Sequence, residues 1–166
     1  MAQFSFDIVS EYDKAQVTNA FDQTQREIAN RYDFKGTPAD IAWLKPQEKN
    51  GIIVTGNSQY QLDAIIDIFR KKLALRGQSQ KILDTTQEPV TANLQAKQTI
   101  PFKQGLNKEQ AKQLTDIIRT FNKKTKAQIQ GDAIRVTSSS KNDLQAIITH
   151  INSQDLPMVL SFTNYR

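Results

Sequence analysis

The chain repeats one stretch of its own sequence at a constant offset of 82 residues. Residues 52–69 read IIVTGNSQYQLDAIIDIF and residues 134–151 read IRVTSSSKNDLQAIITHI, with eight of eighteen positions identical. Each copy contains a short β-branched run, a polar turn and then apolar residues at helical spacing. A repeat of this length is typical of a small domain and too long for a solenoid unit. We therefore expect two copies of one compact domain.

The elements around the repeat are expected in the same order in both halves: strand, helix, strand, strand, helix, strand. Four polar residues have the character of N-caps and predict helix starts: Asp13, Ser58, Asn107 and Ser140. A β-α-β-β-α-β order gives a four-stranded antiparallel sheet with both helices on one face. The predicted fold class is therefore α+β, with two ferredoxin-like (βαββαβ) domains, residues 1–88 and residues 89–166.

Alternating apolar residues and turn signals predict the extended segments. They are expected at residues 4–10, 31–35, 41–45, 51–56, 81–84, 97–103, 127–138 as a hairpin turning at Gly131-Asp132, and 158–166. Residues 85–95 are polar and aperiodic, and are expected to connect the two halves.

Composition limits the class of protein. Cysteine is absent, which excludes disulfides and thiolate metal sites and suits a cytoplasmic protein. No apolar run is long enough to span a bilayer, and the acidic N-terminal residues are unlike a signal peptide. The net charge of +5 is concentrated between Lys97 and Lys141, where ten basic residues accompany three acidic ones. This excess indicates an anionic partner, or else a solvated basic face without one.

The string RYDFKGT, residues 31–37, holds the first group of candidate binding residues. In a strand, Tyr32 and Phe34 would share one face, with Arg31 and Lys35 on the other. Outward-facing rings would offer stacking surfaces to bases, whereas buried rings would leave Arg31 and Lys35 to contact phosphate. The burial of the two rings in the core is the favoured alternative.

The second half of the chain holds the remaining candidates. Tyr165 and Arg166 close the C-terminal strand and are either frayed ends or a stacking and phosphate-binding pair. Lys141 follows a run of serines at a predicted helix N-terminus, where backbone amides favour anions, but helix capping is the favoured explanation of the serines. Arg135 would point outward from the preceding strand.

Catalytic signatures are sparse. His150 is the sole histidine, and no phosphate-binding loop or metal-ligand cluster is present in the sequence, so we expect no enzyme, no metal site and no cofactor. The third strand of each predicted domain also lacks the aromatic residues of RNA-recognition motifs, which disfavours a sequence-specific RNA reader.

Four strings carry a family resemblance: FDIVSE at residues 6–11, NRYDFKGT at residues 30–37, IQGDAIRVTS at residues 129–138, and the terminal SFTNYR. Together they resemble the YajQ family of bacterial proteins over essentially the whole chain. The resemblance implies a tandem of RNA-recognition-like domains that bind nucleotides. Some members of the family are effectors that bind cyclic di-GMP and then engage protein or DNA partners. The resemblance also raises the chance that the first strand or the linker strand is exchanged between the two domains.

The expected function is thus that of a non-enzymatic nucleotide-binding protein, with purine nucleotides or cyclic di-GMP as ligand. The alternative is a module that binds RNA, DNA or the ribosome through a basic face; a protein adaptor is a third hypothesis. The candidate ligand contacts are Arg31, Tyr32, Phe34, Lys35, Arg135, Lys141, Tyr165 and Arg166.

Overall fold

The computed structural model describes residues 2–166, which divide into two compact domains. The discontinuous domain combines the N-terminal residues through Glu11 with residues 104–166, and the continuous domain comprises residues 12–103. The predicted boundary between residues 88 and 89 is therefore displaced. No helix in the described part of the chain has the length and apolar character needed to cross a membrane.

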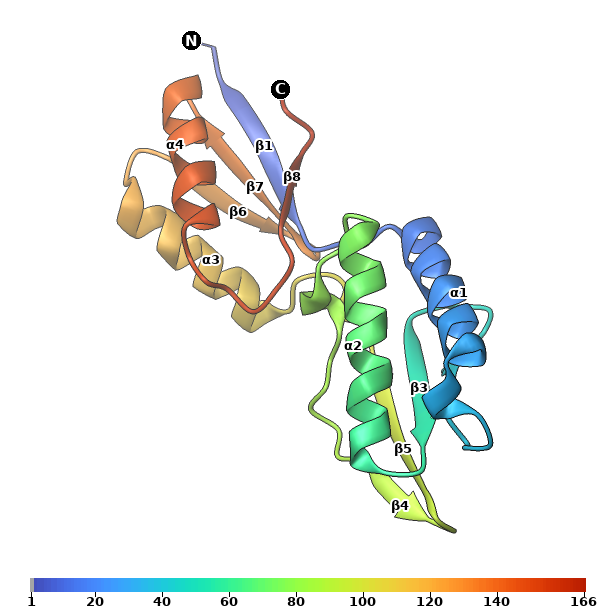
Figure 1. The fold of residues 1–166 in the computed structure, drawn as a ribbon. Helices are drawn as coiled ribbons and strands as arrows, with labels where there is room; N and C mark the ends of the chain where they lie inside the picture. The colour runs from blue at the N-terminus through green and yellow to red at the C-terminus, as the bar shows by residue number, and fades with distance from the viewer. Residues whose placement is uncertain (1) are drawn as a thin grey trace. The chain divides into compact units, whose positions relative to one another are not determined.

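The discontinuous domain is a four-stranded antiparallel sheet in the order β6-β7-β1-β8. Two helices, α3 and α4, lie on one face of this sheet (Figure 1). Its elements in chain order are β1 (Phe4–Val9), α3 (Lys108–Phe121), β6 (Lys126–Gln130), β7 (Ala133–Ser138), α4 (Lys141–Asn152) and β8 (Ser161–Thr163). This is the predicted ferredoxin-like arrangement.

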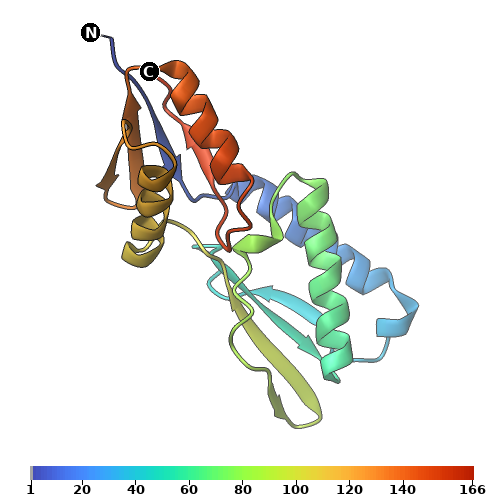
Figure 2. The same ribbon diagram turned by 90° about the vertical axis from the view of Figure 1, so that its left-hand side faces the viewer.

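The continuous domain has the same layers, with α1 and α2 over the sheet β2-β3-β5-β4 (Figure 2). Its elements are α1 (Lys14–Asn30), the 3-10 helix η1 (Tyr32–Phe34), β2 (Asp40–Trp43), β3 (Gly51–Gly56), α2 (Gln59–Leu75), the 3-10 helix η2 (Gln80–Ile82), β4 (Val90–Ala92) and β5 (Gln95–Pro101). The predicted fold class is confirmed: four helices accompany two four-stranded antiparallel sheets in the described chain.

Each sheet takes a central strand from outside its own half of the chain. β1 precedes α1 in sequence but pairs with β7 and β8, whereas β5 precedes α3 but pairs with β3 and β4. A tandem of two simple ferredoxin-like domains would pair them the other way round. Neither half of the chain can complete its sheet alone.

The helices start at the predicted caps. The side chains of Asp13, Ser58, Asn107 and Ser140 each accept a hydrogen bond from a backbone N–H group in the first turn. Asn107 and Gln110 form a reciprocal capping box. One apolar face of each helix then packs on its sheet, as the helical spacing of apolar residues predicts.

Three segments differ from the prediction. Residues 32–34 and 80–82 are 3-10 helices instead of strands, and the expected connection at residues 85–95 contains β4. β4 and β5 form a hairpin whose two turn residues, Asn93 and Leu94, both have positive φ. Turns of this kind normally use Asn-Gly, and Leu94 supplies no such sequence signal.

The placement of β1 can be tested by hydrogen exchange. Phe6 of β1 and Phe69 of α2 are both fully buried, so replacing either by alanine should cost about 3–5 kcal/mol. We expect Phe6→Ala to accelerate amide exchange in β6, β7 and β8, and Phe69→Ala to accelerate it in β2, β3 and β5. Faster exchange in β2 and β3 upon Phe6→Ala would contradict the strand pairing.

Candidate functional site

The eight candidate residues lie in three separate places. Four surround η1 in the continuous domain, and the other four belong to the discontinuous domain. Within the discontinuous domain, Arg135 lies on the sheet face away from the helices. Lys141, Tyr165 and Arg166 line one pocket.

The group around η1 is largely engaged with itself. The Arg31 guanidinium donates hydrogen bonds from Nε and Nη2 to the Asp33 carboxylate at 3.0 and 2.8 Å and lies 4.8 Å above the Phe34 ring. The hydrogen bond to Asp33 raises the pKa of Arg31. Because the segment is helical, the two rings diverge: Tyr32 is 87% exposed and Phe34 only 5%. Tyr32 and the exposed Lys35 are thus the free members of this group.

Arg135 is held by a buried carboxylate. Asp7 lies opposite it in the β1–β7 register, and the Arg135 Nε donates to Asp7 Oδ1 at 3.1 Å. Asn164 donates to the other Asp7 oxygen at 2.8 Å. The Arg135 hydrogen bond is the main reason that the pKa of Asp7 lies below its ordinary value, against an opposing effect of burial. Arg135 is therefore part of a structural network on this face.

The remaining candidates converge on a pocket of about 360 Å³. Lys141 and Arg166 line it together with Tyr165, and the sequence analysis did not identify its other residues: Phe4, Ser5, Leu144, Gln145 and Ile148. Leu144 and Ile148 are four residues apart and both belong to the repeated segment, and this spacing indicates only helix packing. Phe4 begins a strand whose alternation indicates only core. The sequence therefore gives no sign that these residues also line a pocket.

One backbone angle brings Tyr165 to this pocket. Regular alternation along the predicted strand of residues 158–166 would place Tyr165 on the face opposite Phe162. Asn164 instead adopts a φ of 55°, which asparagine tolerates better than most residues, and the alternation breaks there. Both Phe162 and Tyr165 consequently contact Phe6, with ring centroids 5.7 and 6.2 Å away.

The pocket combines an apolar lining with positive charge. The Lys141 ammonium lies 4.9 Å from the centre of the Phe4 ring, and Lys141 is the first residue of α4. The N-terminus of a helix carries partial positive charge from its free amides, so it reinforces the lysine. Backbone hydrogen bonds in both directions between Ser5 and Arg166, at 2.9 and 3.2 Å, hold Arg166 beside β1.

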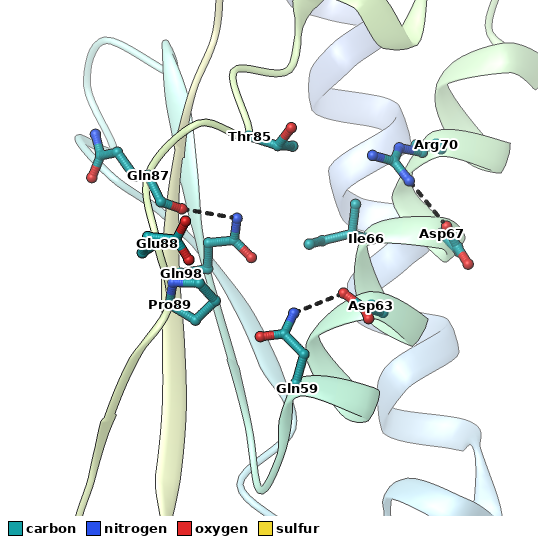
Figure 3. Close-up of a pocket in the computed structure, with 10 residues that line it drawn as sticks. All are labelled: Gln59, Asp63, Ile66, Asp67, Arg70, Thr85, Gln87, Glu88, Pro89 and Gln98. Carbon is teal, nitrogen blue, oxygen red and sulfur yellow. Dashed lines mark hydrogen bonds and ion pairs between the residues drawn. The ribbon is translucent and has the colours of Figure 1, made fainter.

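A larger pocket of about 570 Å³ lies in the continuous domain, between α2 and the segment before β4 (Figure 3). Its charged residues are mostly acidic: Asp63, Asp67 and Glu88, with Arg70 donating to Asp67 at 3.2 Å. Carboxylates repel phosphate, so this pocket does not suit a nucleotide.

The open face of the discontinuous sheet offers no stacking surface. By strand alternation, the residues of β1, β6, β7 and β8 that point away from the helices are polar or aliphatic. His150 is also accounted for, because its ring stacks on Phe121 at 4.2 Å. Among residues 2–166, no group of three acidic or histidine side chains is placed to hold a metal ion.

The network of Asp7 predicts a pH dependence. A carboxyl whose folded pKa is lowered stabilises the fold above its unfolded pKa of about 3.9, and this contribution is lost as pH falls through the folded value. Asp7→Asn should lower the free energy of unfolding by about 1.5–3 kcal/mol at pH 7 and by much less near pH 2. Urea denaturation at both pH values would measure this. Asp116→Asn, at an exposed site of α3, is the control and should change little. An equal loss at both pH values for Asp7→Asn would contradict the assignment.

Comparison with known proteins gives one consistent family. The family model described as "Nucleotide-binding protein YajQ-like" matches residues 4–166. Proteins named as nucleotide-binding proteins from Nocardioides sp. and Thermobifida fusca are 44% and 42% identical over 167 and 166 residues, covering 100% and 99% of both chains. One from Nostoc punctiforme is 41% identical over 163 residues, 98% of both chains. The chain belongs to the YajQ-like family.

Proposed function

We propose that this protein binds a nucleotide, without catalysing its conversion, in the pocket lined by Lys141, Tyr165 and Arg166. The carrying observation is the convergence of an exposed tyrosine ring, an apolar floor and two cations on one cavity. Ligand pockets have this composition, mostly apolar with a few placed polar groups. The relatives that match along nearly the whole chain are named nucleotide-binding proteins, which supports the same conclusion.

Each part of a nucleotide has a counterpart in the pocket. Tyr165 is 64% exposed, so one face of its ring is open to stack on a base, as aromatic side chains do in many nucleotide sites. Leu144 and Ile148 would cover the base edge that faces α4. Lys141, Arg166 and the N-terminus of α4 would neutralise the phosphate.

The volume guides the choice of ligand. A pocket of about 360 Å³ lies at the lower end of the usual range for small-molecule sites. This size favours a single nucleotide unit, so cyclic di-GMP would enter with one guanylate and leave the other outside. We propose a purine nucleotide as the ligand. More specifically, we propose that the protein is a cytoplasmic effector that binds cyclic di-GMP and then acts on a protein or DNA partner.

Binding is favoured over catalysis by the lining itself. The residues lining this pocket include no aspartate, glutamate or histidine that could serve as general base. The alternative of an RNA, DNA or ribosome-binding module finds less support. Two of its basic residues, Lys97 and Lys103, belong to the continuous domain, so the basic run is divided between two domains.

Calorimetry with GMP, GTP and cyclic di-GMP tests the proposal. We expect saturable binding to the unmodified protein, with Tyr165→Ala and Lys141→Gln each weakening it about tenfold through lost stacking and charge pairing. Lys35→Gln removes another exposed lysine charge, beside η1, and is the matched control. Absence of saturable heat with all three nucleotides would overturn the proposal, and a loss only in Lys35→Gln would move the site to η1.

A further inference from the structure

We propose that the discontinuous domain has a second anion site, a pocket between the end of α3 and the edge of β6 that binds a phosphate group. Its volume is about 530 Å³, and its lining comprises Arg119, Lys123, Thr125, Lys126, Ala127 and Gln128. None of these residues belongs to the pocket of Lys141 and Tyr165. The inference is therefore independent of the proposed nucleotide site.

Three cations share this pocket without a counter-charge. No ion pair joins Arg119, Lys123 or Lys126 to an acidic side chain in the described chain. Arg119 lies in the last turn of α3, where the helix dipole favours a cation, but Lys123 and Lys126 follow the helix. Because like charges held close together repel, an anion between them would lower the energy of the arrangement.

A buried hydroxyl indicates the same ligand. Thr125 is 4% exposed, yet its Oγ1 has no hydrogen-bond partner. The two other buried threonines, Thr24 and Thr115, each donate to a carbonyl one helical turn earlier, at 2.8 and 2.7 Å. An unsatisfied buried polar atom is costly, and native structures contain few of them. Thr125 lines the pocket, so a rotation of its side chain to another staggered rotamer would let a phosphate oxygen accept the hydroxyl proton.

Further donors surround the cavity. β6 is the outer strand of its sheet, and edge strands carry backbone N–H groups without a strand partner. Tetrahedral phosphate can accept from several such groups at once, and charge-assisted hydrogen bonds of this kind are the strong ones.

The phosphate could be free or part of a chain. Lys112 lies seven residues before Arg119, two helical turns along the same side of α3, and extends the positive charge away from the pocket. This stripe suits the phosphodiester backbone of a single strand, whereas the pocket alone suits inorganic phosphate or pyrophosphate. The shared chemistry is the phosphate group, and the ligands used in the experiment separate the two sources.

The test is titration of the full chain with pyrophosphate and, separately, with a short poly-dT oligonucleotide. We expect the double substitution Lys123→Gln/Lys126→Gln to weaken binding at least tenfold. For the oligonucleotide, it should also lower the salt slope by about 0.7 for each phosphate contact removed. Lys14→Gln/Lys71→Gln removes two exposed lysines of α1 and α2, is the charge-matched control and should bind normally. Pyrophosphate binding identifies a free phosphate ligand; binding of the oligonucleotide alone identifies a strand.

Thr125→Val distinguishes a ligand contact from a structural role. Valine keeps the shape and removes the unpartnered hydroxyl, so the urea midpoint should stay or rise while phosphate affinity falls several-fold. Tyr165→Ala should leave phosphate binding at the β6 edge intact. This variant therefore separates the test of the phosphate site from the test of the nucleotide pocket. No binding of either probe, or equal affinity in all variants, would overturn the proposal.

Discussion

The antiparallel pairing of β1 between β7 and β8 is the interaction on which the discontinuous domain depends. Phe6 and Ile8 of this strand are fully buried, and Asp7 on its other face holds Arg135 and Asn164. The same strand supplies Phe4 and Ser5 to the proposed nucleotide pocket. A single segment of six residues therefore joins the core, the polar network and the pocket. Any displacement of β1 would alter all three together.

The two proposed sites differ in how they would recognise an anion. At the α4 end, rings and aliphatic side chains accompany Lys141 and Arg166, so a ligand gains from burying a flat apolar body. At the β6 edge, three cations line the cavity with Thr125, Ala127 and Gln128 and no aromatic ring, so recognition there would depend mainly on charge. The first should respond weakly to salt and the second strongly. One domain would thus hold a base-selective site and a charge-selective site.

Local chemistry explains which parts of the fold were predictable. The four helix caps and the Gly131 hairpin turn are short-range patterns, and all appear in the structure. β1 pairs with strands that lie more than a hundred residues away in the sequence, and short-range patterns carry no information about such pairing. Among the candidate site residues, Lys141 could be identified from the helix N-terminus it occupies. The approach of Tyr165 depends on the φ of Asn164, and Phe4 has the pattern of an ordinary core residue.

The central position of β1 also determines the order of events during synthesis. Asp7 and its partners Arg135 and Asn164 are separated by 128 and 157 residues. At typical elongation rates the strand is translated about 6–25 seconds before β7. The whole continuous domain, residues 12–103, is completed in that interval. The continuous domain can fold on the ribosome while both edges of β1 are still unpaired. The first strand to be translated is then among the last to be ordered.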